Sequence, residues 1–152
     1  MKTSVDVIVV GGGNAGIEAS SAISRLGCEV LMITLKKDQI GEMSCNPAIG
    51  GLGKGHLVRE IDALDGVMGR AIDQSGIQFR MLNKSKGPAV HGPRSQADRG
   101  LYKKSVQDIL LLEQKIKVIE GFVDDLIVEN NQIKGVVLDN NNKISCSSLV
   151  IT

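Results

Sequence analysis

The residues with the clearest chemical potential form a glycine-rich turn near the N-terminus. Gly11, Gly13 and Gly16 match the pattern G-x-G-x-x-G, between a β-branched run and a segment of helical periodicity. The first glycine permits a tight turn, the second lets the backbone approach a diphosphate, and the third allows close packing of helix and strand. The N–H groups and partial positive charge of the helix N-terminus would then face the phosphates. The turn therefore predicts a dinucleotide-binding site.

The end of the second predicted strand lacks the residue that most dinucleotide-binding folds place there. An acidic side chain commonly binds the adenosine ribose at this position, but the chain has Thr34, followed by Leu35, Lys36 and Lys37. A threonine hydroxyl forms a weaker hydrogen bond to ribose than a carboxylate does. We interpret the two lysines as solvated surface residues and do not predict a site for the 2′-phosphate of NADP.

Three cysteines differ in the local structure that their surroundings predict. Their wide spacing indicates no disulfide framework and favours a reducing compartment. Cys45 lies in a polar loop and is the candidate reactive thiol, although many loop cysteines have no function, and both interpretations stay open from the residues alone. Cys28 and Cys146 fall in predicted strands and are expected to be inert. His56 and His91 do not complete a metal-ligand spacing with Cys45, so no metal site is predicted.

Composition limits the possible functions further. With 152 residues, 42% of them hydrophobic, the chain can bury one ordinary core and belongs to the globular class. A net charge of +1 gives no global attraction to nucleic acid, so any such contact needs a local basic patch. An aromatic content of 2% leaves too few rings for a base-stacking platform. The apolar run 7–10 is too short to span a membrane, and no signal peptide precedes it, which predicts a cytoplasmic protein without a membrane partner.

A β-α-β unit over residues 5–34 is expected to position the glycine turn. The nearly continuous β-branched run 5–10 predicts a strand buried on both faces of a parallel sheet. The following helix should end at Gly27 and be joined to a second strand, 29–34, by a right-handed crossover. The helix face expected to pack on the sheet consists of Ala15, Ala19, Ala22, Ile23 and Leu26.

Residues 35–95 predict an active-site loop region. Its two glycine-rich loops, 35–55 and 83–94, are expected to be irregular. Between them the pattern predicts short helical stretches around 56–63 and 66–74 and a strand over 77–82. The whole region should therefore be dominated by loops.

The remainder of the chain predicts a helix followed by strands. Residues 97–114 are amphipathic, and 117–147 contains short apolar runs, some separated by asparagines, which predicts a small antiparallel β-meander. A further apolar strand begins at 148–152, so the fold is expected to be incomplete at its C-terminus. The predicted class is α/β: a Rossmann-like dinucleotide-binding fold with a parallel sheet and an antiparallel meander.

Several segments together resemble one family closely. They are GGGNAG (11–16), GEMSCNPAIGG (41–51), KGHLV (54–58), EIDAL (60–64), AIDQSGIQF (71–79) and KGPAV (86–90). The chain is similar to the N-terminal quarter of the FAD-binding subunit of the tRNA uridine 5-carboxymethylaminomethyl modification enzyme, also called the glucose-inhibited division protein A family. It departs from many members in Asn14, where they have histidine, and in His91, where they often have arginine.

The resemblance implies that the Rossmann-like fold is an FAD-binding fold and that the whole chain, 1–152, is the N-terminal part of an FAD-binding domain. It also implies a function and a set of site residues. Members modify the wobble uridine of certain tRNAs with FAD, NADH and methylene-tetrahydrofolate, act with a GTPase partner subunit, and are expected to be homodimers when full length. By position, Gly11, Gly12, Gly13, Asn14, Ala15 and Gly16 would hold the FAD diphosphate. Thr34 agrees with the family, Val123 would contact the cofactor through its backbone, and Cys45 would be the reactive cysteine beside the flavin.

Basic side chains recur through the two loop regions. Those predicted to contact nucleic acid or folate are Lys54, Arg80, Lys84, Lys86 and Arg94. One interpretation is a solvated basic face, and the other is a strip that meets tRNA phosphates or the glutamate tail of folate.

Two alternatives to the modification enzyme are open. One is a related folate- and FAD-dependent tRNA uridine methyltransferase, against which the segment 44–47 argues. The other is a truncated or split-gene fragment without activity of its own, suggested by the end of the chain at Thr152. Such a fragment is expected to bind FAD weakly and to show no turnover.

Overall fold

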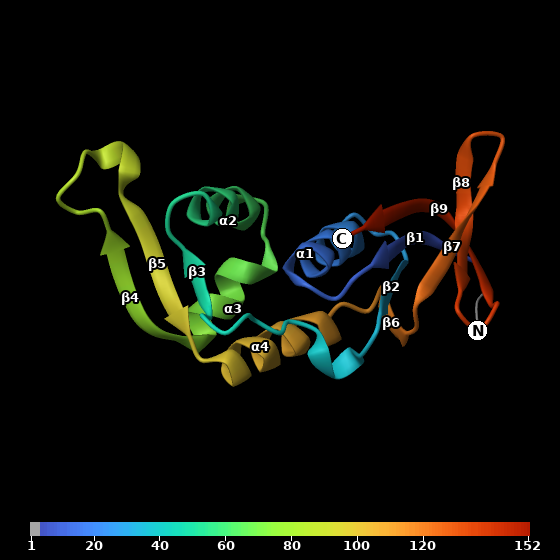
Figure 1. Ribbon diagram of the computed structural model, residues 1–152, viewed down its shortest axis with the longest axis horizontal. Coiled ribbons are helices and arrows are strands. Elements are labelled where there is room, and N and C mark those ends of the chain that lie inside the picture. The colour runs from blue at the N-terminus through green and yellow to red at the C-terminus, as the bar shows by residue number, and fades with distance from the viewer. Residues whose placement is uncertain (1–3) are drawn as a thin grey trace. The chain divides into compact units, whose positions relative to one another are not determined.

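The computed structural model describes residues 4–152, which form two compact units (Figure 1). The first unit contains the residues up to Ile40 together with Leu110–Thr152, and the second is Gly41–Ile109. The elements of the first unit are β1 (Ser4–Val10), α1 (Asn14–Arg25), β2 (Val30–Thr34), the 3-10 helix η1 (Lys37–Gln39), β6 (Ile116–Glu120), β7 (Val123–Glu129), β8 (Gln132–Leu138) and β9 (Lys143–Ile151).

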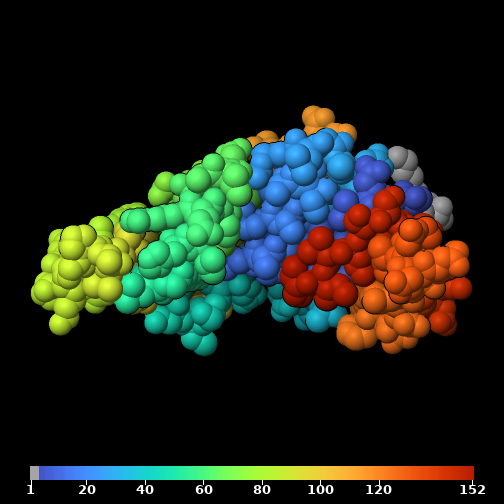
Figure 2. Space-filling model, turned by 90° about the horizontal axis from the view of Figure 1, so that it is seen from above, coloured from blue at the N-terminus to red at the C-terminus, as the bar shows by residue number. Residues whose placement is uncertain are grey.

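One six-stranded sheet organises the first unit, in the order β6-β2-β1-β9-β8-β7. The four strands β6, β2, β1 and β9 run parallel, whereas β9-β8-β7 is antiparallel. Ile8 of β1 pairs with Leu31 of β2 on one side and Leu149 of β9 on the other, which explains why residues 7–10 of β1 are all apolar. Figure 2 shows the red C-terminal segment beside the blue part of the chain that contains β1, as the pairing of β9 with β1 requires. The predicted α/β class, with a parallel sheet and an antiparallel part, is confirmed.

The buried face of α1 differs from the predicted one. Gly16, Ile17, Ser20, Ser21 and Ser24 are its buried residues, whereas Leu26, which was expected to pack on the sheet, is 81% exposed. Serines can occupy a buried face because their small side chains let the helix lie close and their hydroxyls can be paired. The prediction of the packing face from the spacing of the alanines and Leu26 was therefore wrong.

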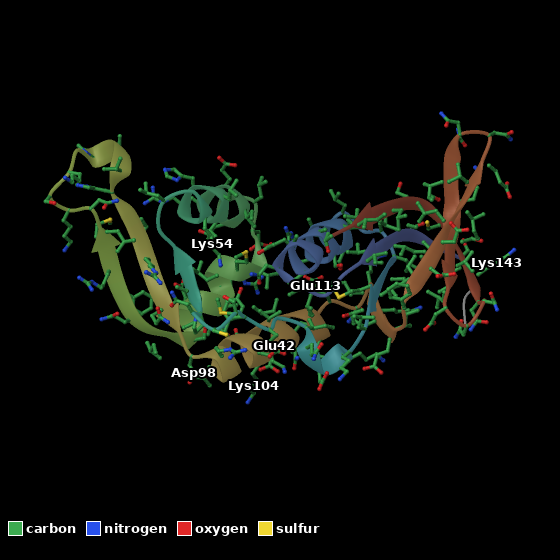
Figure 3. All side chains as sticks on the ribbon, in the orientation of Figure 1. Glu42, Lys54, Asp98, Lys104, Glu113 and Lys143 are labelled. Atoms are coloured by element: carbon green, nitrogen blue, oxygen red, sulfur yellow. The ribbon has the colours of Figure 1, made fainter. Side chains whose placement is uncertain are left out.

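Glu113 provides that pairing for Ser21 and Ser24 from a distant part of the chain, whereas Ser20 Oγ is buried without a hydrogen-bond partner among the described residues. Ser24 Oγ donates to Glu113 Oε2 at 2.7 Å and Ser21 Oγ lies 3.5 Å from Oε1, while Arg25 Nη1 donates to Ser21 Oγ at 2.7 Å. Figure 3 shows Glu113 beside α1. These hydrogen bonds hold the C-terminal end of α1 to the segment that precedes β6.

The C-terminal strands also differ from the prediction. The run 118–119 was expected to belong to the meander, but β6 pairs in parallel with β2. The runs 144–146 and 148–152 were expected to be separate strands, but β9 is one strand that leaves β8 and continues along β1. Short apolar runs have no signal for the partner that they pair with, because pairing depends on residues far away in sequence. The meander itself is limited to β7, β8 and the first part of β9.

The second unit combines helices with a small antiparallel sheet. Its elements are β3 (Ala48–Gly50), α2 (Lys54–Ala63), α3 (Val67–Ser75), β4 (Gly76–Leu82), the 3-10 helix η2 (Pro88–Val90), β5 (Gly92–Ala97) and most of α4 (Arg99–Leu111). The sheet order is β3-β5-β4. Asp98 caps α4, since its Oδ1 accepts a hydrogen bond from the N–H of Leu101 at 2.8 Å. The predicted helices and the strand near 77–82 are present.

Both predicted loops contain regular structure that the sequence did not indicate. β3 falls within 35–55 and β5 begins within 83–94, and the two pair through Ala48–Gln96 and Gly50–Arg94. Pro93 suggested a loop because proline cannot donate to a neighbouring strand. It is accommodated because the β3 ladder reaches only as far as Arg94, and the Pro93 carbonyl accepts the N–H of Gly51 at 2.8 Å. Within residues 4–152, no helix has the length and apolar character needed to cross a membrane.

Candidate functional site

A cavity of about 360 Å³ lies beside the glycine turn in the first unit. Its lining includes Gly11, Gly12 and Gly13 from the turn, Thr34 from the end of β2, and Val123 from the start of β7. Five residues predicted to bind a cofactor are thus brought together, although Val123 is 89 positions beyond Thr34 in the sequence. A cavity of this size is within the range of sites for small molecules and cofactors.

The position of the cavity follows from the sheet topology. In the parallel part, β6-β2-β1-β9, the chain moves outward from β1 on one side through β2 and β6, and β9 lies on the other side of β1. Open α/β sheets bind ligands outside the carboxyl ends of their strands, at the point where the strand order reverses. Gly11–Gly13 follow the carboxyl end of β1, and this is the edge at which that reversal occurs.

Each glycine of the turn has a different steric environment. A Cβ at Gly13 would meet no atom within 4 Å, so the backbone there faces open space. A Cβ at Gly12 would lie 2.9 Å from Thr34 Oγ1, and one at Gly16 would collide with the carbonyl oxygen of Gly11. Gly13 therefore leaves room for a ligand at the backbone, whereas Gly16 is required for contact between helix and strand.

The start of α1 adds hydrogen-bond donors to this turn. Gly13 is the N-cap residue in an extended conformation, and its carbonyl accepts the N–H of Ile17 at 3.0 Å. Asn14 and Ala15 open the helix, and no acidic side chain occupies its first turn. N–H groups in a first turn have no acceptor inside the helix and attract anions. Of the residues predicted to hold the diphosphate, Asn14, Ala15 and Gly16 do not line the cavity, and Gly16 is buried, which agrees with a packing role for it.

Thr34 and its neighbours close the adjacent side of the cavity. The Thr34 carbonyl accepts the N–H of Gly121 at 3.0 Å, which ties the ends of β2 and β6 together. An acidic residue is present at this edge, but on β6: Glu120 pairs with Thr34 in the sheet and its Oε1 accepts the N–H of Lys37 at 2.8 Å. A carboxylate is therefore present at this edge of the sheet, but it binds the backbone of the segment after β2 and does not line the cavity.

Cys45 lies in the second unit, in the segment that leads into β3, and its side chain is exposed. Cys28 is half-buried and Cys146 is buried, and all three thiols are free. Burial raises the pKa of the Cys146 thiol above its usual value, with smaller opposing contributions from backbone hydrogen bonds. The Cys45 thiol is therefore accessible to solvent, whereas the Cys146 thiol is protected by burial. Residues 4–152 contain no group of three or more histidine, cysteine or acidic side chains placed to hold a metal ion.

The predicted basic residues are divided among different environments. Lys54 Nζ donates to the carbonyl of Ala48 at 3.0 Å, beside β3 (Figure 3), and burial lowers the pKa of its ammonium group. Arg80 and Arg94 lie directly opposite each other on β4 and β5. Lys84 and Lys86 are exposed in the connection between these strands. The structure therefore separates the arginine pair from the two loop lysines and gives Lys54 a local partner.

Some residues of these environments had no sequence signal. Gln39 and Phe122 line the cavity beside the glycine turn, and Gln78 and Gln96 accompany the arginine pair. Gln39 lies in a 3-10 helix without periodicity, and the two glutamines come together only through strand pairing. The alternation of polar and apolar residues in β4 could have indicated Gln78 as a residue on the face of Arg80.

Comparison with known proteins decides the family. The family model for glucose inhibited division protein A matches residues 6–152. The chain belongs to this family. It is 60% identical over 150 residues to the tRNA uridine 5-carboxymethylaminomethyl modification enzyme MnmG of Granulibacter bethesdensis, covering 97% of this chain and 24% of that protein. The chain thus spans about a quarter of the length of this relative.

Solved structures agree with the family assignment. The form II crystal structure of Aquifex aeolicus GidA is 48% identical, with a TM-score of 0.93 over 98% of this chain and 25% of that one. PqsL of P. aeruginosa, in complex with 2-aminobenzoylacetate, has a TM-score of 0.71 at 14% identity, over 96% of this chain and 42% of that one. The second likeness shows only that the fold is shared beyond the family.

Proposed function

We propose that this chain is the FAD-binding part of an enzyme that modifies the wobble uridine of tRNA to 5-carboxymethylaminomethyluridine. The observation that carries the proposal is the cavity at the carboxyl ends of β1 and β2, into which the backbone at Gly13 is open. The relative from G. bethesdensis, named for this modification, supports the choice of reaction.

The residues around the cavity fit the ADP half of FAD. The N–H groups of Gly12, Gly13, Asn14 and Ala15 would donate to the diphosphate, where the helix N-terminus also favours negative charge. The Thr34 hydroxyl, which lines the same cavity as the turn, would bind the ribose, and the Val123 backbone would contact the adenosine part. When bound, the flavin would supply redox chemistry that no side chain of this chain can perform.

Two further roles are proposed for the second unit. Cys45 would be the reactive thiol of the modification, since its side chain is exposed and free. Lys84 and Lys86 would contribute positive charge toward the substrate RNA or the glutamate tail of folate, and Arg80 and Arg94 would do so separately from the strands β4 and β5.

Cofactors and partners beyond FAD complete the proposal. NADH would reduce the flavin, methylene-tetrahydrofolate would supply the one-carbon unit, and a GTPase subunit would act with the full-length homodimer. The reaction is proposed to take place in the cytoplasm, where tRNA and free thiols coexist.

Analysis of tRNA nucleosides tests this function directly. The intact protein, meaning the full-length gene product, would be incubated with unmodified tRNA, FAD, NADH, methylene-tetrahydrofolate, GTP, the GTPase subunit and either ammonium or glycine. Mass spectrometry of the digested tRNA is expected to detect an aminomethyl or carboxymethylaminomethyl uridine that is lost when FAD is omitted. Uridine methylation in place of these products would refute the proposal, as would a reaction that does not require FAD.

A further inference from the structure

The three-stranded sheet of the second unit has two faces of opposite character. Phe79 and Met81 of β4 line a cavity of about 400 Å³ together with residues of α2 and α3, such as Val58 and Ile72. Alternate residues of a strand point to opposite faces. Gln78 and Arg80 therefore belong to the opposite face of β4, although Arg80 and Arg94 also line part of this cavity, as does Asp73.

Strand pairing assembles a polar cluster on that second face. Gln78 lies opposite Gln96, and Arg80 lies opposite Arg94, in the register of β4 and β5. Residues directly opposite in an antiparallel pair have Cβ atoms about 5 Å apart and interact. The four side chains, together with Leu82, line a small cavity. The cluster is thus two arginines flanked by two amides, all on adjacent strands.

The two arginines of this cluster have no acidic partner. Among residues 4–152, neither Arg80 nor Arg94 forms an ion pair with a carboxylate. Arg94 Nη2 donates to Asn46 Oδ1 at 3.4 Å, and Gln96 Nε2 is 3.5 Å from the same oxygen. Like charges directly opposite each other destabilise a sheet. An oxyanion between the guanidinium groups would replace this repulsion with charge-assisted hydrogen bonds.

The size of the cavity limits what can bind there. Its volume is about 80 Å³, between the roughly 30 Å³ that a water molecule occupies in the liquid and the several hundred cubic ångströms of sites that enclose a whole ligand. A single phosphate group therefore fits, whereas a whole nucleotide does not. The site would hold one group of a larger molecule that otherwise lies outside it.

We propose that Arg80 and Arg94, flanked by Gln78 and Gln96, form a binding site for one backbone phosphate of RNA. The inference rests on the proposed function, in which the substrate is a tRNA, and adds which residues contact its backbone. Guanidinium groups match the geometry of phosphate oxygens, and the glutamine amides can both donate to and accept from an adjacent ribose 2′-hydroxyl. Asn46, which is hydrogen-bonded to this cluster, directly follows Cys45 in sequence, so a phosphate held here brings RNA to the loop of the reactive thiol.

A pair of matched double variants of the intact protein tests the site. In the first, Arg80→Gln and Arg94→Gln remove the proposed phosphate ligands. In the control, Arg70→Gln and Arg99→Gln remove the same charge from arginines of the same unit that already lie near Asp65 and Glu42, at 3.9 and 3.3 Å. tRNA binding is measured over a range of salt concentrations, and FAD content and the thermal midpoint are measured for each protein.

The first variant is expected to bind tRNA more weakly and to reduce the slope of log K against log salt by about 0.7–0.9, the contribution of one phosphate contact. It should retain FAD, and its thermal midpoint should stay the same or rise, because a repulsive pair has been removed. The control should retain the wild-type slope. Equal slopes for the first variant and wild type, or equal losses in both double variants, would overturn the site while leaving the proposed function intact. Failure of the wild-type protein to bind tRNA would overturn the proposed function as well.

Discussion

Alanine at Gly13 separates a ligand-binding role of the glycine turn from a structural one. The residue has φ −79° and ψ −179°, which alanine adopts without strain, and its Cβ would meet no atom within 4 Å. Alanine is a poorer N-cap than glycine, at a cost of roughly 0.5–1 kcal/mol. It also lowers the entropy of the unfolded chain, which stabilises by about 0.4–1 kcal/mol. The two effects nearly cancel, so the free energy of unfolding should change by less than about 1 kcal/mol.

The same change should strongly weaken FAD binding. If the diphosphate occupies the open space at Gly13, the new methyl group displaces it and removes at least one hydrogen bond from the backbone to a charged oxygen. Such a bond contributes about 1.5–3 kcal/mol, so the dissociation constant should rise roughly 10- to 150-fold. Fluorescence titration of the intact apoprotein with FAD measures this change.

Gly16→Ala is the matched control for Gly13→Ala. Its Cβ would collide with the backbone carbonyl of Gly11, so α1 must move away from β1. Overpacking of this kind costs about 1–3 kcal/mol, and the thermal midpoint of the apoprotein should fall. Both variants would bind less FAD, but only Gly16→Ala should unfold earlier. Unchanged FAD affinity in Gly13→Ala would refute the placement of the diphosphate.

Three other changes probe the remaining site residues of the intact protein. Cys45→Ser should abolish tRNA modification while FAD binding is retained. Modification at the wild-type rate would exclude Cys45 as the reactive thiol. Iodoacetamide at pH 8 should alkylate Cys45 much faster than Cys146, whose raised pKa keeps its thiol protonated, as peptide mass mapping will reveal. Lys84→Glu combined with Lys86→Glu should weaken tRNA binding and flatten its salt dependence, whereas an unchanged slope would favour a merely solvated basic loop. Thr34→Val, which preserves the shape next to the turn, should weaken FAD binding about 2- to 12-fold through loss of one neutral hydrogen bond, and no change in titration would remove the ribose contact.

The part of the fold that the sequence predicts best is the part whose structural signals lie close together in the chain. The β-α-β unit was predictable because the β-branched run of β1, the glycine turn and the stop at Gly27 are close in sequence and each has one structural meaning. The buried face of α1 was not, because its packing residues are serines. Two of them, Ser21 and Ser24, are paired with Glu113, which lies 89 positions after Ser24.

The candidate site shows the same division between local and distant information. The cavity residues of the glycine turn were predictable from its spacing, and Val123 only from the family resemblance, because it reaches the cavity through the pairing of β2 with β6. Gln39 and Phe122 carry no pattern that separates them from ordinary loop residues. Residues that are near in sequence and constrained by backbone geometry are therefore predictable, whereas residues recruited by a neighbouring strand are not.

Strand pairing also separates the arginine pair from the other basic residues, which the sequence alone does not do. In sequence, Arg80 and Arg94 were two members of a scattered basic set, with no reason to separate them from Lys54. The pairing of β4 with β5 places both guanidinium groups on one face without a carboxylate partner, and Lys54 instead donates to the carbonyl of Ala48. A positive charge that already has a local acceptor gains less from an added phosphate than a pair that repels until an anion arrives. Specific recognition of RNA by this unit should therefore depend more on the two strand arginines than on Lys54, although the formal charge of the three side chains is the same.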